Sequence, residues 1–441
     1  MKTSHFFLSS LATLSLLGSP ILHADDWANW RGPNHNGASS EEGKFPSSFS
    51  RTKNVKWKAE LPGVGASTPI VSGDAIFLTS ADEKENGIIA MRVDAKSGEV
   101  VWSKKFGEGV SKDPKSTYSG PSPTTDGKVV IFFTGNGELT AFDFDGKEIW
   151  KRDIQKDYGQ FAFGWTFSTS PLLHKGMLYL QVLQRDTAVD GRGFTDKKNE
   201  SYLLALNPAD GKEIFKVERD SNAVVESREA FTSPIPVTHD GREEITVVGG
   251  DVMTGHDPKS GQELWRWGTW NPDLEKYWRL VPSPVYGEGI LLACAPKGQP
   301  VYAINAGGVG DLNDTALAWV NEEKQISSDV PTPLFYDGHF YIVNGRQKFI
   351  SCVEPVTGKV LYTERLAAKQ KIESSPTAVD GKIYLMSHLG EVFVIKAGPE
   401  FKLLNSTTMA SDQSTNIRAS VVPANGNLFI RTDNTLYCIG E

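Results

Sequence analysis

The chain has 441 residues, a formal net charge of −8 and a hydrophobic fraction of 39%. With 42 glycines, 24 prolines and 11 tryptophans, this composition is typical of a turn-rich globular protein and excludes a disordered or fibrous chain. The mildly acidic balance, without a run of lysines or arginines, argues against nucleic acid or an anionic membrane as the partner.

Residues 1–24 have the pattern of an export signal. Lys2 gives a positive start, an apolar run follows from Phe6 to Leu17, and Ala24 offers a small residue before a cut. The alternative, a membrane anchor, is disfavoured because the run is short and acidic Asp25 and Asp26 follow it. We expect cleavage near Ala24 and a periplasmic or secreted protein. We expect no membrane span, and no lipid anchor because no cysteine lies near the cut.

One phrase recurs along the rest of the chain. "SSPTAVDGKIYLMS" at residues 374–387 reads as a β-hairpin, with a Ser/Thr-Pro start and an Asp-Gly turn. The phrase occurs eight times, and its Ser/Thr is residue 68, 122, 170, 233, 283, 332, 375 or 420. In the last copy Val421 replaces the proline. Spacings of 43 to 63 residues are typical of a propeller or a solenoid.

A second phrase follows each hairpin and predicts a third strand, a glycine-containing turn and a fourth strand. The fourth strand carries a large residue: Trp102, Trp150, Phe215, Trp265, Trp319, Tyr362 and, in the seventh copy, Leu404. The eighth copy ends before this strand, whereas "NVKWKAEL" with Trp57 precedes the first hairpin. We therefore predict an all-β, eight-bladed β-propeller of four-stranded antiparallel blades, closed by an N-terminal strand. Residues 25–53 form an N-terminal extension and residues 54–441 a single propeller domain.

The three cysteines, Cys294, Cys352 and Cys438, lie in separate apolar strand-like runs. We interpret them as buried free thiols, not as a disulfide framework or a metal site. The histidines of the mature chain are scattered without metal-site spacing, and no nucleophile elbow or phosphate-binding loop is present. No catalytic residue and no metal ligand is assigned.

The repeated "SP…DG…(A)xDxxSG…W" phrase resembles the repeat of quinoprotein-type propellers, named after pyrroloquinoline quinone (PQQ) enzymes, over residues 54–441. The N-terminal "WANWRGPNHNGASS" resembles the opening of exported bacterial PQQ-like repeat proteins, and the architecture is similar to that of the outer-membrane assembly scaffold BamB. The enzymes of this group use an adjacent cysteine pair, a calcium ion and a catalytic Asp. The chain lacks the cysteine pair, so no cofactor is expected; PQQ with calcium is the alternative.

Strand alternation places the loops between the second and third strands, and those between blades, on one face of a propeller. The insertion 184–201 in the third blade and "ADEKENG" at 81–87 in the first belong to this face. The segments before each Ser/Thr-Pro should ring the channel mouth there. They carry the candidate binding residues Trp165, Arg228, Glu229, Trp278, Arg279, Asp329, Lys371, Glu373 and Arg418.

Four cations, three carboxylates and two indoles at one mouth could bind a carboxylate, a phosphate, a glycan or a peptide group. The alternative is that these charges pair among themselves across a solvated funnel. We predict a non-catalytic, monomeric binding scaffold of the cell envelope whose partner is an envelope protein, a small polar ligand or a glycan. The alternatives are a PQQ-dependent oxidoreductase and a carbohydrate-binding propeller that uses Trp165 and Trp278.

Overall fold

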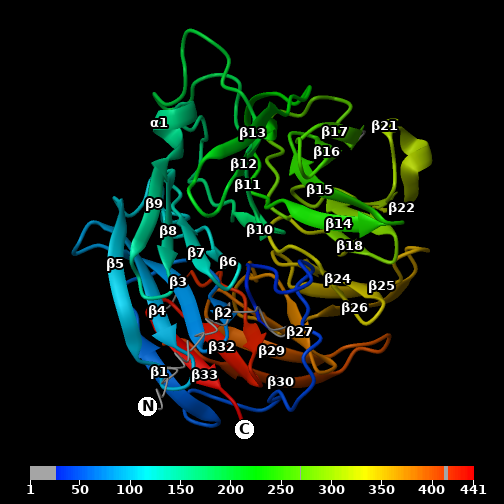
Figure 1. Ribbon diagram of the computed structural model, residues 1–441. Helices are drawn as coiled ribbons and strands as arrows, with labels where there is room; N and C mark the ends of the chain where they lie inside the picture. Colours follow the sequence, from blue (N-terminus) through cyan, green and yellow to red (C-terminus); the bar gives the residue numbers. More distant parts are fainter. Residues whose placement is uncertain (1–25, 269, 412–415) are drawn as a thin grey trace, which may run out of the picture.

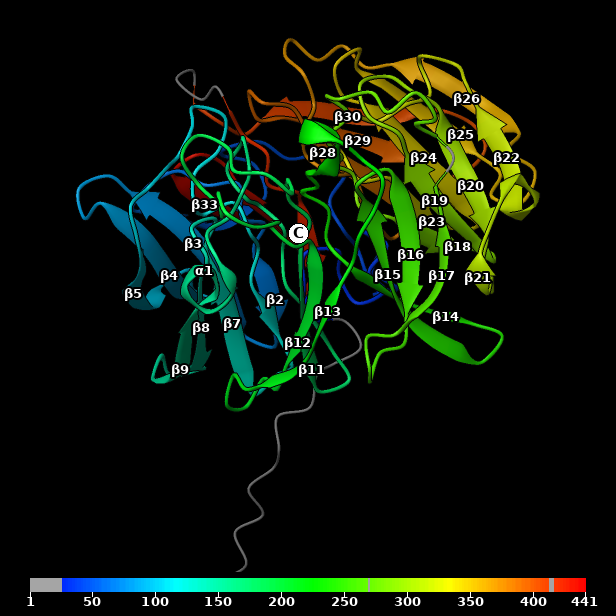
Figure 2. The same cartoon turned by 90° about the horizontal axis from the view of Figure 1, so that it is seen from above.

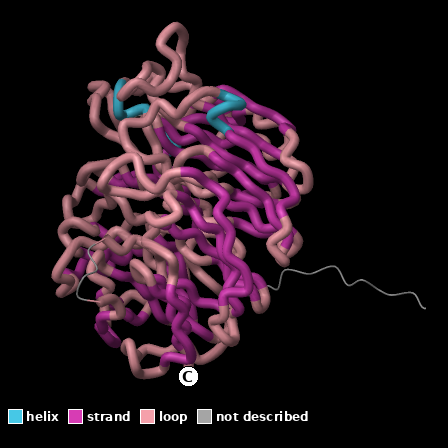
Figure 3. The backbone as a smooth tube through the Cα atoms, turned by 90° about the vertical axis from the view of Figure 1, so that its left-hand side faces the viewer, coloured by secondary structure: helices cyan, strands magenta, loops and turns pink. Residues whose placement is uncertain are grey.

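The computed structural model describes residues 26–268, 270–411 and 416–441, and the predicted export signal lies outside these ranges. The strands form eight sheets, as the repeat count predicts. In Figure 1 the sheets follow one another around a ring in chain order, and Figure 2 places the blade of β6 to β9 and the blade of β23 to β26 on opposite sides. Figure 3 shows strands throughout, with only short helical turns.

The first four blades share one pattern, in which consecutive antiparallel strands run from the innermost to the outermost position. Blade one contains β2 (Ile70–Ser72), β3 (Ala75–Asp82), β4 (Gly87–Asp94) and β5 (Val100–Glu108); blade two contains β6 (Thr124–Thr125), β7 (Val129–Phe133), β8 (Glu138–Asp143) and β9 (Glu148–Asp153). Blade three contains β10 (Leu172–His174), β11 (Met177–Val182), β12 (Tyr202–Leu206) and β13 (Glu213–Glu218); blade four contains β14 (Ile235–His239), β15 (Arg242–Gly249), β16 (Val252–His256) and β17 (Glu263–Trp267).

The remaining blades continue this order. Blade five contains β18 (Val285–Gly287), β19 (Ile290–Cys294), β20 (Val301–Asn305) and β22 (Leu317–Asn321); blade six contains β23 (Leu334–Tyr336), β24 (His339–Asn344), β25 (Phe349–Val353) and β26 (Val360–Arg365). Blade seven contains β27 (Thr377–Val379), β28 (Lys382–Met386), β29 (Glu391–Lys396) and β30 (Leu403–Thr408); blade eight contains β31 (Val422–Ala424), β32 (Asn427–Arg431) and β33 (Thr435–Ile439). The helical turns are α1 (Ile154–Tyr158), η1 (Val225–Arg228) and η2 (Asp314–Ala316).

The ring closes as predicted. The N-terminal strand β1 (Val55–Glu60) pairs antiparallel with β33, with Trp57 opposite Cys438. The eighth sheet therefore has the order β1-β33-β32-β31 and joins the two ends of the propeller domain. Because β1 covers the edge of β33, the closure removes an unpaired strand edge.

Two details differ from the predicted pattern. Blade four has a fifth strand, because β21 (Gly310–Asp311), from the long turn between β20 and β22, pairs parallel with β17 and covers part of its edge. In blade one, β3 ends at Asp82 and β4 begins at Gly87. The loop expected at 81–87 is therefore only a short turn. The insertion 184–201 does lie between β11 and β12, as expected.

Indoles on the outer strands join neighbouring blades. Four of them donate to a carbonyl in the turn between the third and fourth strands of the next blade, at 2.6 to 2.9 Å; the pairs are Trp57 with Ala95, Trp102 with Phe144, Trp150 with Pro208, and Trp319 with Pro355. Trp265 differs, because it donates at 3.0 Å to Glu244 of its own blade. The corresponding turn of blade five is the long segment that carries β21.

The glycine in each of these turns faces the indole. Gly146 has φ +81°, and a Cβ added there would lie 2.9 Å from the Trp102 ring. Glycine is therefore required twice at this position, by the left-handed backbone and by the ring that packs against it. The turn glycine of one blade and the tryptophan of the preceding blade, both part of the repeated second phrase, are thus in contact.

Candidate functional site

The loops between blades surround a cavity of about 370 Å³ at one end of the channel, which we call the mouth. Most charged and aromatic side chains of its lining come from segments that precede the inner strands of blades three to eight, as strand alternation predicts. The exceptions are Lys115, before the inner strand of blade two, and Arg346, between the second and third strands of blade six. Its lining includes Lys115, Trp165, Phe231, Arg279, Val281, Asp329, Val330, Arg346, Lys371, Ile372, Glu373 and Arg418.

Trp165 and Arg279 form one side of the mouth. The indole of Trp165 donates to Glu226 at 3.2 Å, and the ammonium of Lys115 lies 3.3 Å from the centre of its ring. Arg279 pairs with Asp329 at 3.4 Å and approaches Glu226 at 4.0 Å. Lys115 thus forms a cation–π contact with one face of the Trp165 indole.

Glu373 is the centre of the other side. Its carboxylate accepts from His388 at 2.9 Å and from Arg418 at 2.8 Å, and it also pairs with Lys371. Burial alone would raise the pKa of Glu373, but the bond from His388 and the charge of Arg418 outweigh it and hold the pKa well below its ordinary value. Glu373 is therefore ionised, and it fixes the directions of two cations at the mouth.

The mouth is positively charged although the chain is acidic. Five cationic side chains, Lys115, Arg279, Arg346, Lys371 and Arg418, line the cavity with two carboxylates, Asp329 and Glu373. Glu226, outside the lining, adds a third carboxylate beside Trp165 and Arg279, so cations still outnumber carboxylates by two. Arg346 is exposed and has no ion pair within the described ranges. A guanidinium without a counter-ion at the rim of a cavity is suited to bind a carboxylate or a phosphate.

Below the mouth the channel narrows to a neck of about 100 Å³ that shares Phe231, Val281 and Val330 with it. Six of the eight repeated Ser/Thr residues line this neck, at positions 68, 122, 170, 233, 375 and 420. The hydroxyls of the repeat link the blades, because seven of the eight backbone N–H groups donate to the hydroxyl of the next blade at 2.8 to 3.0 Å. The links run 68 to 122, 122 to 170, 170 to 233, 233 to 283, 283 to 332, 332 to 375 and 420 to 68. The hydroxyl of Ser420 has no partner within the described residues.

The N-terminal extension closes the far end of the channel. Its carbonyls extend inner strands on both sides of the ring: Trp27 accepts from Val71 and Ala28 from Thr125, while Asn36 accepts from Phe335 and Gly37 from Ala378. In Figure 1 this blue segment lies near the middle of the ring. Trp30 lines the neck from below. The channel is therefore a blind funnel that is open at the mouth.

Arg31 holds this closure in place. It is 2% exposed and donates to the carbonyls of Pro333 at 2.9 Å and of Pro376 and Asn36 at 3.1 Å. Burial lowers the pKa of Arg31 to about 9, which still leaves the guanidinium charged at neutral pH. Carbonyls of blades six and seven thus anchor the "WRGP" segment across the channel.

The structure brings six of the nine predicted binding residues to the mouth: Trp165, Arg279, Asp329, Lys371, Glu373 and Arg418. The other three lie outside its lining. Arg228 is buried and pairs with Asp220 at 2.8 Å, and Glu229 is fully buried against Arg185 of the insertion 184–201. Trp278 packs against a hydrophobic core cluster. A sequence position just before Ser/Thr-Pro therefore does not show whether a side chain faces the channel or packs within a loop.

Lys115 and Arg346 were missed by the sequence reasoning. Both lie on the same face as the predicted residues, but in other positions: Arg346 follows β24 in a loop between second and third strands, and Lys115 lies in the long segment after β5. The alternation argument already placed such second-to-third-strand loops on this face, so Arg346 could have been found by examining every one of them.

The PQQ and calcium implied by the repeat do not fit the donors present. Cys294, Cys352 and Cys438 are buried in blades five, six and eight, and burial raises the pKa of each to about 12. Within the described residues no group of three or more His, Cys, Asp or Glu side chains is arranged to hold a metal ion. The described residues thus offer neither adjacent thiols nor a cluster of three His, Cys, Asp or Glu side chains that could hold calcium.

Comparison with known proteins agrees with the fold. A family model described as outer membrane protein assembly factor BamB matches residues 40–180. Among solved structures, BamB from Moraxella catarrhalis is similar with a TM-score of 0.60 and 13% identity, over 88% of this chain and 99% of that one. The chain has a PQQ-like, BamB-like architecture.

Redox enzymes share the same fold. Quinohemoprotein alcohol dehydrogenase from Comamonas testosteroni has a TM-score of 0.62 and 11% identity, over 95% of this chain and 81% of that one. A europium-containing methanol dehydrogenase has a TM-score of 0.64 and 11% identity, over 93% and 91%. No curated protein matches the sequence. No helix in the described part of the chain is both long and apolar enough to cross a bilayer. At these identities the similarity concerns the fold, and function has to be argued from the site.

Proposed function

We propose that the protein is an exported, non-catalytic propeller of the cell envelope that binds an anionic group of a ligand or partner at the mouth. The observation that carries this proposal is the excess of cations over carboxylates, five to three with Glu226 included, around a cavity of about 370 Å³ in a chain of net charge −8. Such a reversal of sign concentrates anions at the mouth and orients them toward the guanidinium groups.

The mouth supplies both charge and apolar surface. Phe231, Val281 and Ile372 line it beside the cations, so a bound group can bury carbon as well as pair its charge. The floor at Trp30 makes the funnel blind, which favours the end of a chain or a small molecule over a threaded polymer. The export pattern of residues 1–24 and the BamB-like architecture support the envelope location.

Binding, not catalysis, is the function that the residues favour. The lining of the mouth contains cations held by carboxylates but neither cysteine nor histidine, and His388, which donates to Glu373, lies outside the lining. Ser168, which lines both the mouth and the neck, makes no hydrogen bond to a base within the described residues. No side-chain pair of this lining has the geometry of an activated nucleophile.

The test is a titration with two anionic probes, citrate and a hexaglutamate peptide, at low and high salt. Arg346→Glu should weaken binding at least about tenfold, because it replaces a free cation by a repelling carboxylate. Arg51→Glu is the matched control, since Arg51 is exposed on the extension and the charge change is the same. Equal affinity of Arg346→Glu and the wild type, or an affinity that does not fall with rising salt concentration, would contradict the proposal.

A further inference from the structure

A second cavity, of about 340 Å³, lies at the outer part of blade four and does not share a residue with the mouth. It lies where the turn between β15 and β16 meets two loops between blades. Its lining includes Asn222, Asp251, Arg266, Trp267, Asn271, Leu274 and Asp311. We call it the blade-four cavity.

Two polar atoms of this lining have no partner. Asp251 is 9% exposed, and its Oδ1 makes no hydrogen bond within the described residues. Trp267 is 1% exposed, and its indole N–H is likewise unpaired there. Buried polar groups are nearly always satisfied, so an acceptor and a donor left open beside one cavity indicate a missing molecule.

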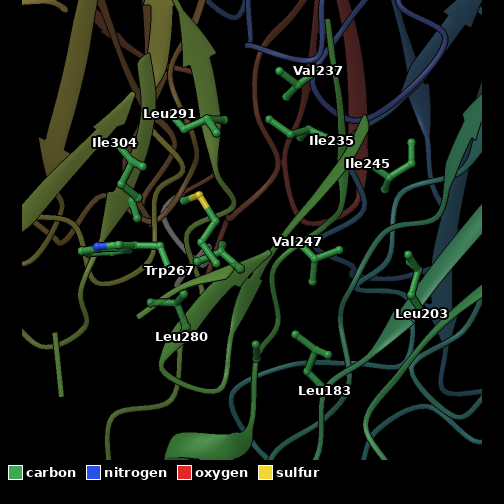
Figure 4. Packing of buried hydrophobic residues seen from close by; sticks show 14 of the residues in the cluster. Leu183, Leu203, Ile235, Val237, Ile245, Val247, Trp267, Leu280, Leu291 and Ile304 are labelled. Atoms are coloured by element: carbon green, nitrogen blue, oxygen red, sulfur yellow. The ribbon is translucent and has the colours of Figure 1, made fainter. Parts of the chain in front are cut away.

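The surrounding side chains hold both groups in place. Asn271 donates to the other oxygen of Asp251 at 2.6 Å and accepts from the backbone of Glu275 at 2.8 Å, which fixes the loop over the carboxylate. Trp267 packs against the tilted rings of Trp270 and Tyr302, whose centres both lie 5.3 Å from its own. Figure 4 shows Trp267 beside Ile304 and Leu280 in the core cluster. The open atoms therefore belong to rigid groups.

The nearby cations are already engaged. Arg266 is held by Glu263 at 2.5 and 2.8 Å. Arg219 donates to Thr254 at 3.1 Å and to the carbonyls of Val252 at 2.7 Å and of Gly249. Asp311 is exposed and adds a second negative charge at the rim.

The carboxylate of Asp251 makes no ion pair within the described residues, since Arg266 pairs with Glu263 and Arg219 donates to a hydroxyl and two carbonyls. Burial raises its pKa to about 6, and the hydrogen bonds from Asn271 and Trp270 only partly oppose this shift. Near neutral pH the cavity thus contains a buried negative charge, which is costly unless a cation pairs with it.

We infer that the blade-four cavity binds a protonated primary amine that also carries a hydrogen-bond acceptor. The ammonium pairs with Asp251, and the acceptor of the same ligand accepts from the indole of Trp267. Two sources present this chemistry: a free small molecule such as an amino sugar, and a lysine side chain with its backbone carbonyl. Leu274 at the rim, 44% exposed, provides apolar contact for the carbon skeleton of either.

The test is a thermal-shift and calorimetric titration of the purified protein with two matched pairs of probes. Each pair combines an amine with its uncharged counterpart: glucosamine with glucose, and Nα-acetyl-lysine amide, which has a free ε-ammonium, with Nα-acetyl-norleucine amide. We expect saturable binding of at least one amine and at least about tenfold weaker binding of its uncharged counterpart. The pair that responds identifies the source.

Variants separate this site from the mouth. Asp251→Asn should abolish amine binding while keeping the hydrogen bond from Asn271, and Asp311→Asn is the matched control because its exposed carboxylate lines the same cavity. Arg346→Glu should leave amine binding unchanged. Absence of amine binding at millimolar concentration, equal binding of the uncharged probes, or binding retained in Asp251→Asn would each overturn the inference, whatever the mouth binds.

Discussion

The hydroxyl ring of the neck makes a quantitative prediction. In the wild type the backbone N–H of Ser122 donates to the hydroxyl of Ser170 at 3.0 Å. Ser170→Ala removes this acceptor. Ser122 is 1% exposed and Ser170 is 6% exposed, so the N–H is shielded from bulk solvent within the neck. A buried donor left unsatisfied costs about 1–3 kcal/mol, and the change removes too few atoms to add a large cavity cost. We therefore expect Ser170→Ala to lower the free energy of unfolding by about 1–3 kcal/mol.

Equilibrium unfolding in urea, followed by far-UV circular dichroism and by tryptophan fluorescence, measures this difference. Ser170→Thr should remain within about 0.5 kcal/mol of the wild type, because threonine already occupies the equivalent position in blades one and six. Ser103→Ala, at an exposed serine of β5, controls for loss of a hydroxyl alone. If Ser170→Ala is as stable as Ser103→Ala, or if Ser170→Thr is as unstable as Ser170→Ala, the ring does not hold the blades together through hydroxyls.

Three further outcomes follow from single contacts. Gly146→Ala should lower the free energy of unfolding in urea by about 1–3 kcal/mol more than Gly176→Ala. Both glycines have a positive φ, but only Gly146 faces an indole. Equal losses of stability in the two variants would contradict this contact. Because the folded state raises the pKa of Asp251 from 3.8 to about 6, it retains a proton that the unfolded chain releases. The free energy of unfolding should therefore fall by roughly 3 kcal/mol between about pH 4 and pH 6, and Asp251→Asn should remove this fall; a pH-independent difference between the two proteins would refute it. With PQQ and calcium the protein should not reduce a redox dye with alcohols or sugars, and turnover would restore the oxidoreductase alternative.

The sequence predicted the fold well because the repeat encodes contacts between blades. The Ser/Thr before proline marks the hydroxyl ring, and Gly146 with Trp102 marks the contact between blades one and two. The hydroxyl link occurs seven times and the indole bond four times among the described residues, and the displaced strand with Trp57 explains how the ring closes. The fifth strand β21 was missed because "GGVG" has the composition of an ordinary loop, and its pairing depends on where β17 lies in space.

The site was predicted only in part, for a physical reason. Topology assigned the correct face, but side-chain direction within a loop depends on local backbone and on partners distant in sequence. Glu229, adjacent to the mouth in sequence, turns inward to Arg185, which is 44 residues away. Asp251 gave no signal at all, because its importance comes from burial without a counter-ion, which only packing reveals.

The most direct test of anion binding at the mouth is a crystal structure of the protein with the hexaglutamate peptide. We predict a carboxylate of the peptide at the guanidinium of Arg346, with further contacts to Lys371 or Arg279 and apolar contact with Phe231. A peptide bound on another face, or a mouth that stays free of it while solution binding is measured, would contradict the proposed function.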